Sequence, residues 1–384
     1  MHEAFEKFIR TYLSLPEGAI PLHRAVSGHE ELAQLTDCLV SGQLSSVGDK
    51  VETFETTIAR EQNVSFAIAT QSGTSALHLA LLGSGLQAGD LVITQPFTYV
   101  ASCNAIRYCG ADPLFVDVER SSLGLCPDAL LGFLEQETEF RHNTCFHKLT
   151  QRKISHCVPV CSFGHPPKLD LIEKICQHYS IRMVVDGAEA QGSSYRNRAV
   201  GTYGLATVLS FNGNKIVTCG GGGMLLTNNQ QMAERVRHLS QQAKVAEPQH
   251  GFFHDAIGYN YRMPALNAAL GLGQLSRLSQ KKEAMRQLAH RFESFFSNYG
   301  LAVQQEPDAA CSNYWQQCLL FPKEQERDAF VADMQSRKID CRPAWTLMTH
   351  LPMYRDCHAT GTPHARWAER HLALLPSLAP SPNW

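Results

Sequence analysis

The chain reads Met183-Val184-Val185-Asp186-Gly187-Ala188-Glu189 and, a little further on, Leu209-Ser210-Phe211-Asn212-Gly213-Asn214-Lys215. Each stretch begins as a short apolar run, which is typical of a buried strand. Each then reaches ionisable side chains, and the second leads into four consecutive glycines, Gly220 to Gly223. Ligands of parallel sheets bind at the carboxyl ends of the strands, so the two stretches predict a polar site there.

Asp186 and Lys215 meet two different chemical demands of one cofactor, pyridoxal phosphate. The Lys215 amine can form a Schiff base with the cofactor aldehyde, and the Asp186 carboxylate can keep the pyridine nitrogen protonated, so that the ring accepts electrons. A lysine after a strand is usually a surface residue, and an aspartate there often caps a helix. The pairing of both residues with the glycine run favours the cofactor interpretation.

The wider pattern predicts an α/β fold. Short apolar runs recur at residues 66–70, 91–94, 113–118, 157–161, 182–185, 207–211 and 224–227. Helical patterns lie between several of them, so we expect a mostly parallel seven-stranded sheet between helices. After the glycines, residues 230–243 and 263–296 are expected to be helices. We expect a large cofactor-binding domain over residues 1–250, with an N-terminal helical arm, and a smaller α/β domain over residues 251–384.

Composition narrows the class of protein. The 384 residues carry 34 Lys and Arg against 36 Asp and Glu, a formal charge of −2, so nothing indicates a nucleic acid as partner. No apolar run is long enough to span a membrane, and the N-terminus is not typical of a signal peptide. The 13 Cys show no metal-like spacing, so we expect free thiols, no metal site and a cytoplasmic location.

Backbone donors and hydroxyls for a phosphate occur in Ser72-Gly73-Thr74-Ser75, directly before a helical pattern. A helix N-terminus favours an anion through its free N–H groups and its dipole. Ser210 is placed to add a hydroxyl from the neighbouring strand end. Tyr99 opens another predicted helix, where its ring can stack on the cofactor or simply pack in the core. The glycine run is not followed by Lys-Ser/Thr, so close backbone approach explains it better than a P-loop.

Two further segments leave alternatives open. Residues 258–264 read Gly-Tyr-Asn-Tyr-Arg-Met-Pro just before a predicted helix. This segment is either a capping loop or a means for Asn260 and Arg262 to reach a phosphate or carboxylate. The basic stretch 140–156 is interpreted as a solvated loop or hairpin, with nucleotide contact as the alternative.

At this point the residues resemble a known family. SGTSALHLAL from residue 72, VVDGAEA, LSFNGNK with GGGGML, and GYNYRMPALNAALG are similar to the DegT/DnrJ/EryC1/StrS sugar aminotransferases. IPLH near 20, SSVG at 45, FGHP at 163, SNYW at 312 and RPAWTLM at 342 extend the likeness to nearly the whole chain. This wider set resembles the LegC-like branch, which aminates C4 of 4-keto-6-deoxy nucleotide sugars for the legionaminic acid and bacillosamine pathways.

The resemblance implies a fold-type-I pyridoxal-phosphate enzyme that works as a homodimer with shared active sites. It implies roles for three groups of residues. Lys215 and Asp186 would be catalytic; the cofactor would be held by Gly73, Thr74, Ser75, Tyr99, Glu189, Ser210 and, from the other subunit, Asn260; and the sugar would be contacted by Tyr314, Arg262 and Trp345.

The expected reaction is transfer of an amine from L-glutamate to a nucleotide-linked 4-keto-6-deoxy sugar, with a UDP-linked 2-acetamido sugar as the expected substrate. Alternatives within the family are amination at C3 or of another keto sugar. Dehydrating relatives carry His at the position of Lys215, which disfavours dehydration. A regulatory protein that keeps the cofactor fold without catalysis is the alternative from another class, although none of the cofactor-binding residues is lost.

Overall fold

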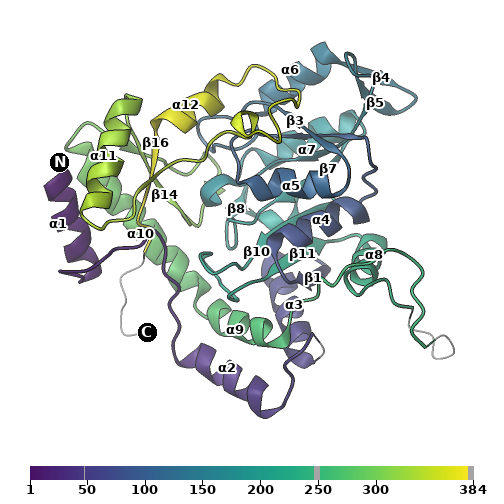
Figure 1. Cartoon of the computed structure of the whole chain (residues 1–384), viewed down its shortest axis with the longest axis horizontal. Coiled ribbons are helices and arrows are strands. Elements are labelled where there is room, and N and C mark those ends of the chain that lie inside the picture. Colours follow the sequence, from purple (N-terminus) through teal and green to yellow (C-terminus); the bar gives the residue numbers. More distant parts are fainter. Residues whose placement is uncertain (47, 246–250, 379–384) are drawn as a thin grey trace.

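A computed structural model describes residues 1–46, 48–245 and 251–378 of the chain (Figure 1). Three features of the sequence therefore lie wholly or partly outside the described residues. They are Val47 of the SSVG motif, the domain boundary expected at residue 250, and residues 379–384 of the smaller domain expected over 251–384. Among the described residues, no helix is both long enough and apolar enough to cross a membrane.

The centre of the molecule is a mixed sheet whose main path has the seven expected strands. Their order is β1 (Phe66–Thr70), β11 (Gly223–Thr227), β10 (Ala206–Ser210), β7 (Arg182–Asp186), β6 (Lys153–Val158), β2 (Leu91–Thr94) and β3 (Asp112–Phe115). All pairs are parallel except those made by β11, which runs antiparallel to both of its neighbours. The strands β1 and β10 on either side of β11 therefore point the same way, and their carboxyl ends meet the edge where β7 ends.

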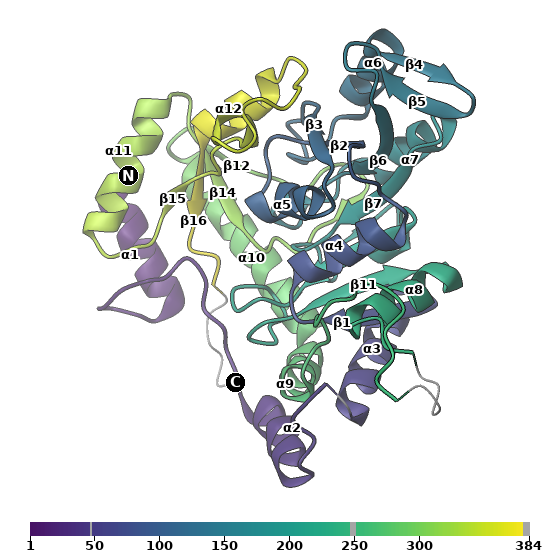
Figure 2. The same cartoon turned by 45° about the vertical axis from the view of Figure 1, so that its right-hand side comes forward.

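Helices cover both faces of this sheet, as Figure 2 shows. One face packs against α4 (Gly73–Gly83), α5 (Val100–Tyr108) and α8 (Gln230–Ser240). The other face packs against α6 (Pro127–Glu137) and α7 (Leu169–His178) at one end, and against α3 (Asp49–Gln62) and α9 (Ala265–Leu275) at the other. Strand residues alternate between the two cores, with Val184 in one and Val185 in the other, so burial on both faces explains the continuous apolar runs.

The helix expected over residues 263–296 is two helices. Its first part is α9, which packs on α2 (His29–Val40) and α3, and its second part is α10 (Leu278–Ser297). Ser276 and Arg277 separate them, and the chain changes partners there because α10 packs into the C-terminal core. Periodicity continues across this break, which is why the sequence pattern suggested one helix.

The C-terminal part contains a second, smaller sheet of β12 (Ala302–Val303), β14 (Gln317–Leu320), β16 (Leu372–Leu375) and β15 (Arg342–Pro343). It packs with α10, α11 (Glu324–Ser336) and α12 (Pro363–His371). The N-terminal helix α1 (His2–Leu13) joins this core through Phe5 and Ile9, which pack among Phe292 and Phe330. The N-terminal helix, which the sequence grouped with the first 250 residues, therefore packs against the C-terminal part of the chain.

The basic segment around residues 140–156 forms a hairpin, as one of its two interpretations expected. Strands β4 (Thr138–Arg141) and β5 (Thr144–His147) pair with each other, and β5 pairs with β6. A three-stranded ribbon joins the two parts of the chain, since β13 (Ala310–Cys311) pairs with β8 (Ser194–Tyr195), which pairs with β9 (Arg198–Ala199).

Candidate active site

An open pocket of about 1730 Å³, which includes the solvent space at its mouth, lies at the carboxyl ends of β1, β10 and β7. Thr70 of β1 and Ser210 of β10 both pair with Gly223 of β11, so this strand sets the spacing of the two ends. A Cβ atom at Gly223 would overlap the backbone carbonyl of Ser72. Close backbone approach is therefore the reason for a glycine here, as the sequence suggested.

Asp186 is the last residue of β7, and its side chain is buried at the inner wall of the pocket. The Ser102 hydroxyl donates to its Oδ2 at 2.7 Å, and the Ala188 amide donates to its Oδ1 at 3.1 Å. Burial raises the pKa of Asp186, and these two donors and the Lys215 charge counteract only part of that effect. The carboxylate is thus a desolvated acceptor that gains from a cationic N–H partner.

Lys215 reaches the same pocket from the turn after β10. Its Nζ donates to Glu189 Oε1 at 3.1 Å and lies 4.0 Å from the ring centroid of Trp315. The second carboxylate oxygen of Glu189 accepts from the Phe163 amide at 2.7 Å. Burial raises the pKa of Glu189 as well, although Lys215 opposes the shift. The Lys215 amine is therefore held by the Glu189 carboxylate and the face of the Trp315 ring. It lines the same pocket as Asp186, the last residue of β7.

Gly73, Thr74 and Ser210 line the pocket at the N-terminus of α4. A Cβ atom at Gly73 would come 2.9 Å from Cβ of Ser210. The start of α4 and the end of β10 can therefore approach this closely only because residue 73 has no side chain. Ser75 lies one step behind, where its amide and hydroxyl bind the Ser72 hydroxyl at 3.1 and 2.8 Å. The first turn of α4 and the Ser210 hydroxyl fit a phosphate group.

Four of the remaining predicted residues divide into two groups. Tyr99, at the N-terminus of α5, and Trp345 both line the pocket, and 60% of Tyr99 is exposed there. Asn260 and Arg262 do not line the pocket of their own chain; Asn260 is exposed and pairs with Gln241, and Arg262 pairs with Thr70.

Tyr314 is buried and does not line the pocket, which is where a sugar contact would be needed. Its hydroxyl accepts from the Glu306 amide at 3.0 Å, and its ring packs edge-on against His165. The backbone of Tyr314 has φ of 50° and its side chain is buried, whereas the ring of Trp315 faces Lys215. The pocket thus contains the neighbour of the residue that the sequence suggested.

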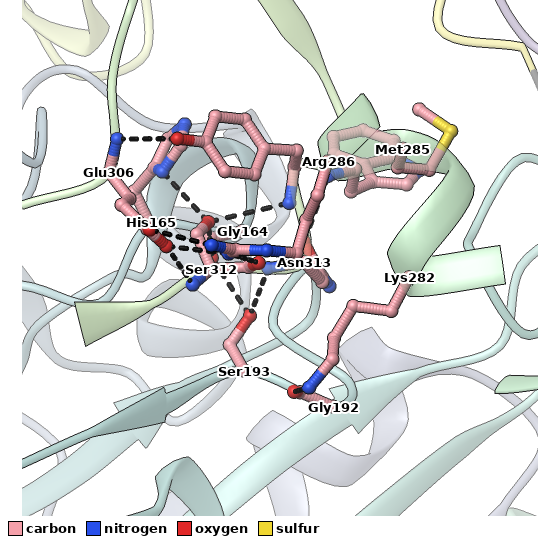
Figure 3. Close-up of polar contacts among 12 residues, drawn as sticks. Gly164, His165, Gly192, Ser193, Lys282, Met285, Arg286, Glu306, Ser312 and Asn313 are labelled. Carbon is pink, nitrogen blue, oxygen red and sulfur yellow. Dashed lines mark hydrogen bonds and ion pairs between the residues drawn. The ribbon is translucent and has the colours of Figure 1, made fainter. Parts of the chain in front are cut away.

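A polar network holds the loop that carries Trp315, and its contacts were not among those predicted from the sequence (Figure 3). Asn313 Nδ2 donates to the carbonyls of Glu189 and Gln191 at 2.7 and 2.9 Å, and Asn313 Oδ1 accepts from the Trp315 amide at 2.8 Å. The network is extended by Ser312, which donates to Gly164 O at 2.6 Å, and by the Arg286–Glu306 ion pair at 2.7 Å. It joins the C-terminal part of the chain to the wall that holds Lys215.

His23 also lines the pocket and was not among the predicted site residues. Its ring stacks on Trp315 with 4.8 Å between centroids and an interplanar angle of 5°. Burial lowers its pKa to about 4, and its Nε2 lies 2.9 Å from Oε1 of Gln316. Trp315 is therefore held between a neutral imidazole and the amine of Lys215, an arrangement that only long-range contacts create.

The donor set fits pyridoxal phosphate at both ends. The buried carboxylate of Asp186 suits the pyridinium, the α4 start with Ser210 suits the phosphate, and Lys215 stands between them. The fold and this site together define a fold-type-I pyridoxal-phosphate-dependent aminotransferase.

The comparisons with known proteins agree. The profile of the DegT/DnrJ/EryC1/StrS aminotransferase family matches residues 26–380, and the chain belongs to this family. It is 32% identical to the GDP-perosamine synthase of Escherichia coli O157:H7 over 94% of each chain, and 32% identical to that of Vibrio cholerae over 87% of each. The crystal structure of the aminotransferase TlmJ from Streptoalloteichus hindustanus superposes with a TM-score of 0.84 at 27% identity over 94% of each chain.

Proposed function

We propose that the protein transfers the amine of L-glutamate to C4 of a nucleotide-linked 4-keto-6-deoxy sugar, as a cytoplasmic homodimer. The observation that carries this proposal is the placement of Lys215, Asp186 and the α4 phosphate cradle around one pocket in a chain of this family. C4 is supported by the relatives, whose names describe synthesis of a nucleotide sugar aminated at that carbon. A cytoplasmic location agrees with thirteen free thiols.

Bound pyridoxal phosphate supplies the electron sink that makes the α-proton of the donor acidic. Lys215 is the only lysine among the described residues that line the pocket, so we assign it the proton transfers on one face of the donor and acceptor carbons. Asp186 holds the pyridinium proton, and Ser102 keeps its carboxylate oriented at 2.7 Å. Glu189 binds the Lys215 ammonium at 3.1 Å and returns it to the same position after each transfer.

The outer half of the pocket suits a large acceptor. Trp345 packs 4.4 Å from the Phe163 ring, between centroids, and lines the pocket together with Arg342 and Tyr99. Aromatic faces bind the apolar side of a sugar ring, and a guanidinium binds a phosphate. We assign Trp345 to the sugar and keep the UDP-linked 2-acetamido sugar of the LegC-like branch as the first substrate to test. The GDP-linked sugar indicated by the relatives is the competing acceptor.

The decisive experiment uses the purified holoenzyme and follows the cofactor absorption. L-Glutamate should change the spectrum, with one 2-oxoglutarate released per site, and a suitable keto sugar should restore it. A UDP-linked 2-acetamido-4-keto-6-deoxy sugar and a GDP-linked 4-keto-6-deoxy sugar are compared as acceptors, and NMR of the product locates the amine. An amine at C3 would replace the C4 proposal by the C3 alternative. A spectrum indifferent to every amino donor would favour the regulatory alternative.

Shared active sites are tested by mixing two inactive variants. Asn260 is exposed outside its own pocket, so we propose that it completes the site of the partner. A Lys215→Ala chain paired with an Asn260→Ala chain would then contain one site with both residues intact. Activity should rise from near zero to as much as about half of the wild-type value per active heterodimer. No recovery, with heterodimers verified by mass, would show that Asn260 acts within its own subunit.

A further inference from the structure

Three side chains from distant segments meet outside the cofactor pocket. Glu137 is the last residue of α6, His147 is the last residue of β5, and His358 lies in the segment that precedes α12. One nitrogen of each histidine and one carboxylate oxygen all lie within 4.8 Å of one another. Figure 1 shows the β4–β5 hairpin beside α6 at one end of the central sheet. None of the three residues lines the cofactor pocket.

The separations suit a small divalent cation. His358 Nε2 lies 2.9 Å from Glu137 Oε2, and His147 Nε2 lies 3.9 Å from the same oxygen. Four-coordinate zinc has bonds of about 2.0–2.1 Å to nitrogen and oxygen, so its ligand atoms are about 3.3 Å apart. The two observed distances lie on either side of that value. With all three donor atoms within 4.8 Å of one another, a tetrahedral cation would need shifts of up to about 1 Å in the side chains.

The backbone already places the three donors. The β4–β5 register sets His147 opposite Thr138, the residue after Glu137, and the Lys148 amide donates to Glu137 O at 2.9 Å. On the other side, the Phe115 amide donates to His358 O at 2.9 Å and fixes that segment along the edge of β3. Main-chain pairing thus brings Glu137, His147 and His358 together. This pairing does not depend on any charge interaction among the three side chains.

The histidine that is most buried is also oriented by a second contact. His147 is only 1% exposed, and its Nδ1 lies 3.0 Å from Thr150 Oγ1. If Nδ1–H donates to this hydroxyl, Nε2 carries the lone pair that faces Glu137; such support of the far ring nitrogen is usual for metal-bound histidines. Phe133 lies beside both histidine rings. The partly exposed side chains of Glu137 and His358, at 40% and 26%, leave room for a water ligand.

We propose that Glu137, His147 and His358 bind one divalent cation of the zinc class and join the hairpin to the C-terminal segment. Two imidazoles and one carboxylate suit zinc better than calcium or magnesium, which prefer oxygen ligands. The site is structural, because the cofactor chemistry uses other residues. Sequence spacing predicted no metal, since the ligands are spread over more than 200 positions and only the fold gathers them.

The test is a zinc titration of the holoenzyme, freed of any affinity tag, by calorimetry and by thermal unfolding. One ion per protomer should bind, and the unfolding midpoint should rise and fall back when a chelator is added. His358→Gln should weaken binding at least tenfold and remove the thermal shift, with the cofactor still bound. His350→Gln is the matched control, because His350 also contacts a carboxylate, Glu369, at 3.0 Å, but without a second histidine.

Cobalt distinguishes this site from the thiols. The bound ion should give a visible spectrum of nitrogen and oxygen ligands, without a thiolate charge-transfer band, and Cys357→Ser should leave it unchanged. The proposal is overturned if zinc binds wild type and His358→Gln equally well, if Cys357→Ser abolishes binding, or if no ion binds. In the last case the cluster is a hydrogen-bonded pair of His358 and Glu137 with His147 beside it. None of these results bears on the aminotransferase proposal, whose test follows the cofactor.

Discussion

Replacing Gly164 by alanine should destabilise the protein, because it breaks the hydrogen bonds that hold the Trp315 loop beside Lys215. Gly164 has φ of +91°, a conformation that costs an L-residue about 1–2 kcal/mol. The new Cβ atom would also overlap Oδ1 of Asn313, which must then leave its place. Asn313 makes three hydrogen bonds there, to Glu189, Gln191 and Trp315, each with a net value of about 0.5–1.5 kcal/mol. We therefore expect Gly164→Ala to lose about 2.5–6.5 kcal/mol of stability if all three bonds are lost.

The assay is denaturant unfolding at one fixed protomer concentration, with cofactor affinity measured on the same samples. Gly132→Ala is the matched control, because Gly132 lies inside α6 and its Cβ would meet no atom within 4 Å. The control should gain about 0.5–1 kcal/mol. Adding Asn313→Ala to Gly164→Ala should cost less than the two single changes together, because the overlap is then gone. Equal stability of Gly164→Ala and wild type would refute the close contact between Gly164 and Asn313.

Three further changes test the pocket. Lys215→Ala should abolish glutamate-dependent release of 2-oxoglutarate, while thermal unfolding shows that the protein is folded. Gly73→Ala pushes α4 away from Ser210 and should weaken cofactor binding at least tenfold, about 1.4 kcal/mol, in a fluorescence titration. Burial raises the pKa of Asp186 above 3.8, so its ionisation destabilises the apoprotein as pH rises above that value. Asp186→Asn apoprotein should therefore gain stability over wild type between pH 4 and 8, measured by thermal unfolding, while losing turnover; a difference independent of pH would contradict the assignment.

Local sequence patterns were sufficient to predict the strands of the central sheet and the positions of Asp186, Lys215, Gly73 and Ser210. Asp186 and Lys215 each follow an apolar run that is buried on both faces, so their place at the strand ends could be inferred from the chain itself. The same holds for Gly73 and Ser210, because a strand that leads into a helix places its turn at the sheet edge. These signals extend over ten residues or fewer and depend little on the rest of the fold.

Contacts between distant segments were not predictable in this way. Asn313 binds carbonyls more than 120 positions earlier, and His23 stacks on Trp315, almost 300 positions later. The SNYW motif did mark the right loop, but it could not show that Tyr314 is buried away from the pocket while Trp315 lines it. The helix break at 276–277 is hidden for a similar reason, since both halves continue one apolar period and differ only in what they pack against.

Charge explains why these residues form a cofactor site before any cofactor binds. Asp186 and Glu189 are both buried, and burial raises the pKa of each, while the Lys215 amine contacts Glu189 from this wall. Two carboxylates facing one ammonium leave the inner wall able to accept one more positive charge, which a pyridinium supplies. The opposite end, at the N-terminus of α4, attracts an anion. A ligand that is cationic at one end and a phosphate at the other therefore satisfies both ends at once, and reversing it would place like charges together at each.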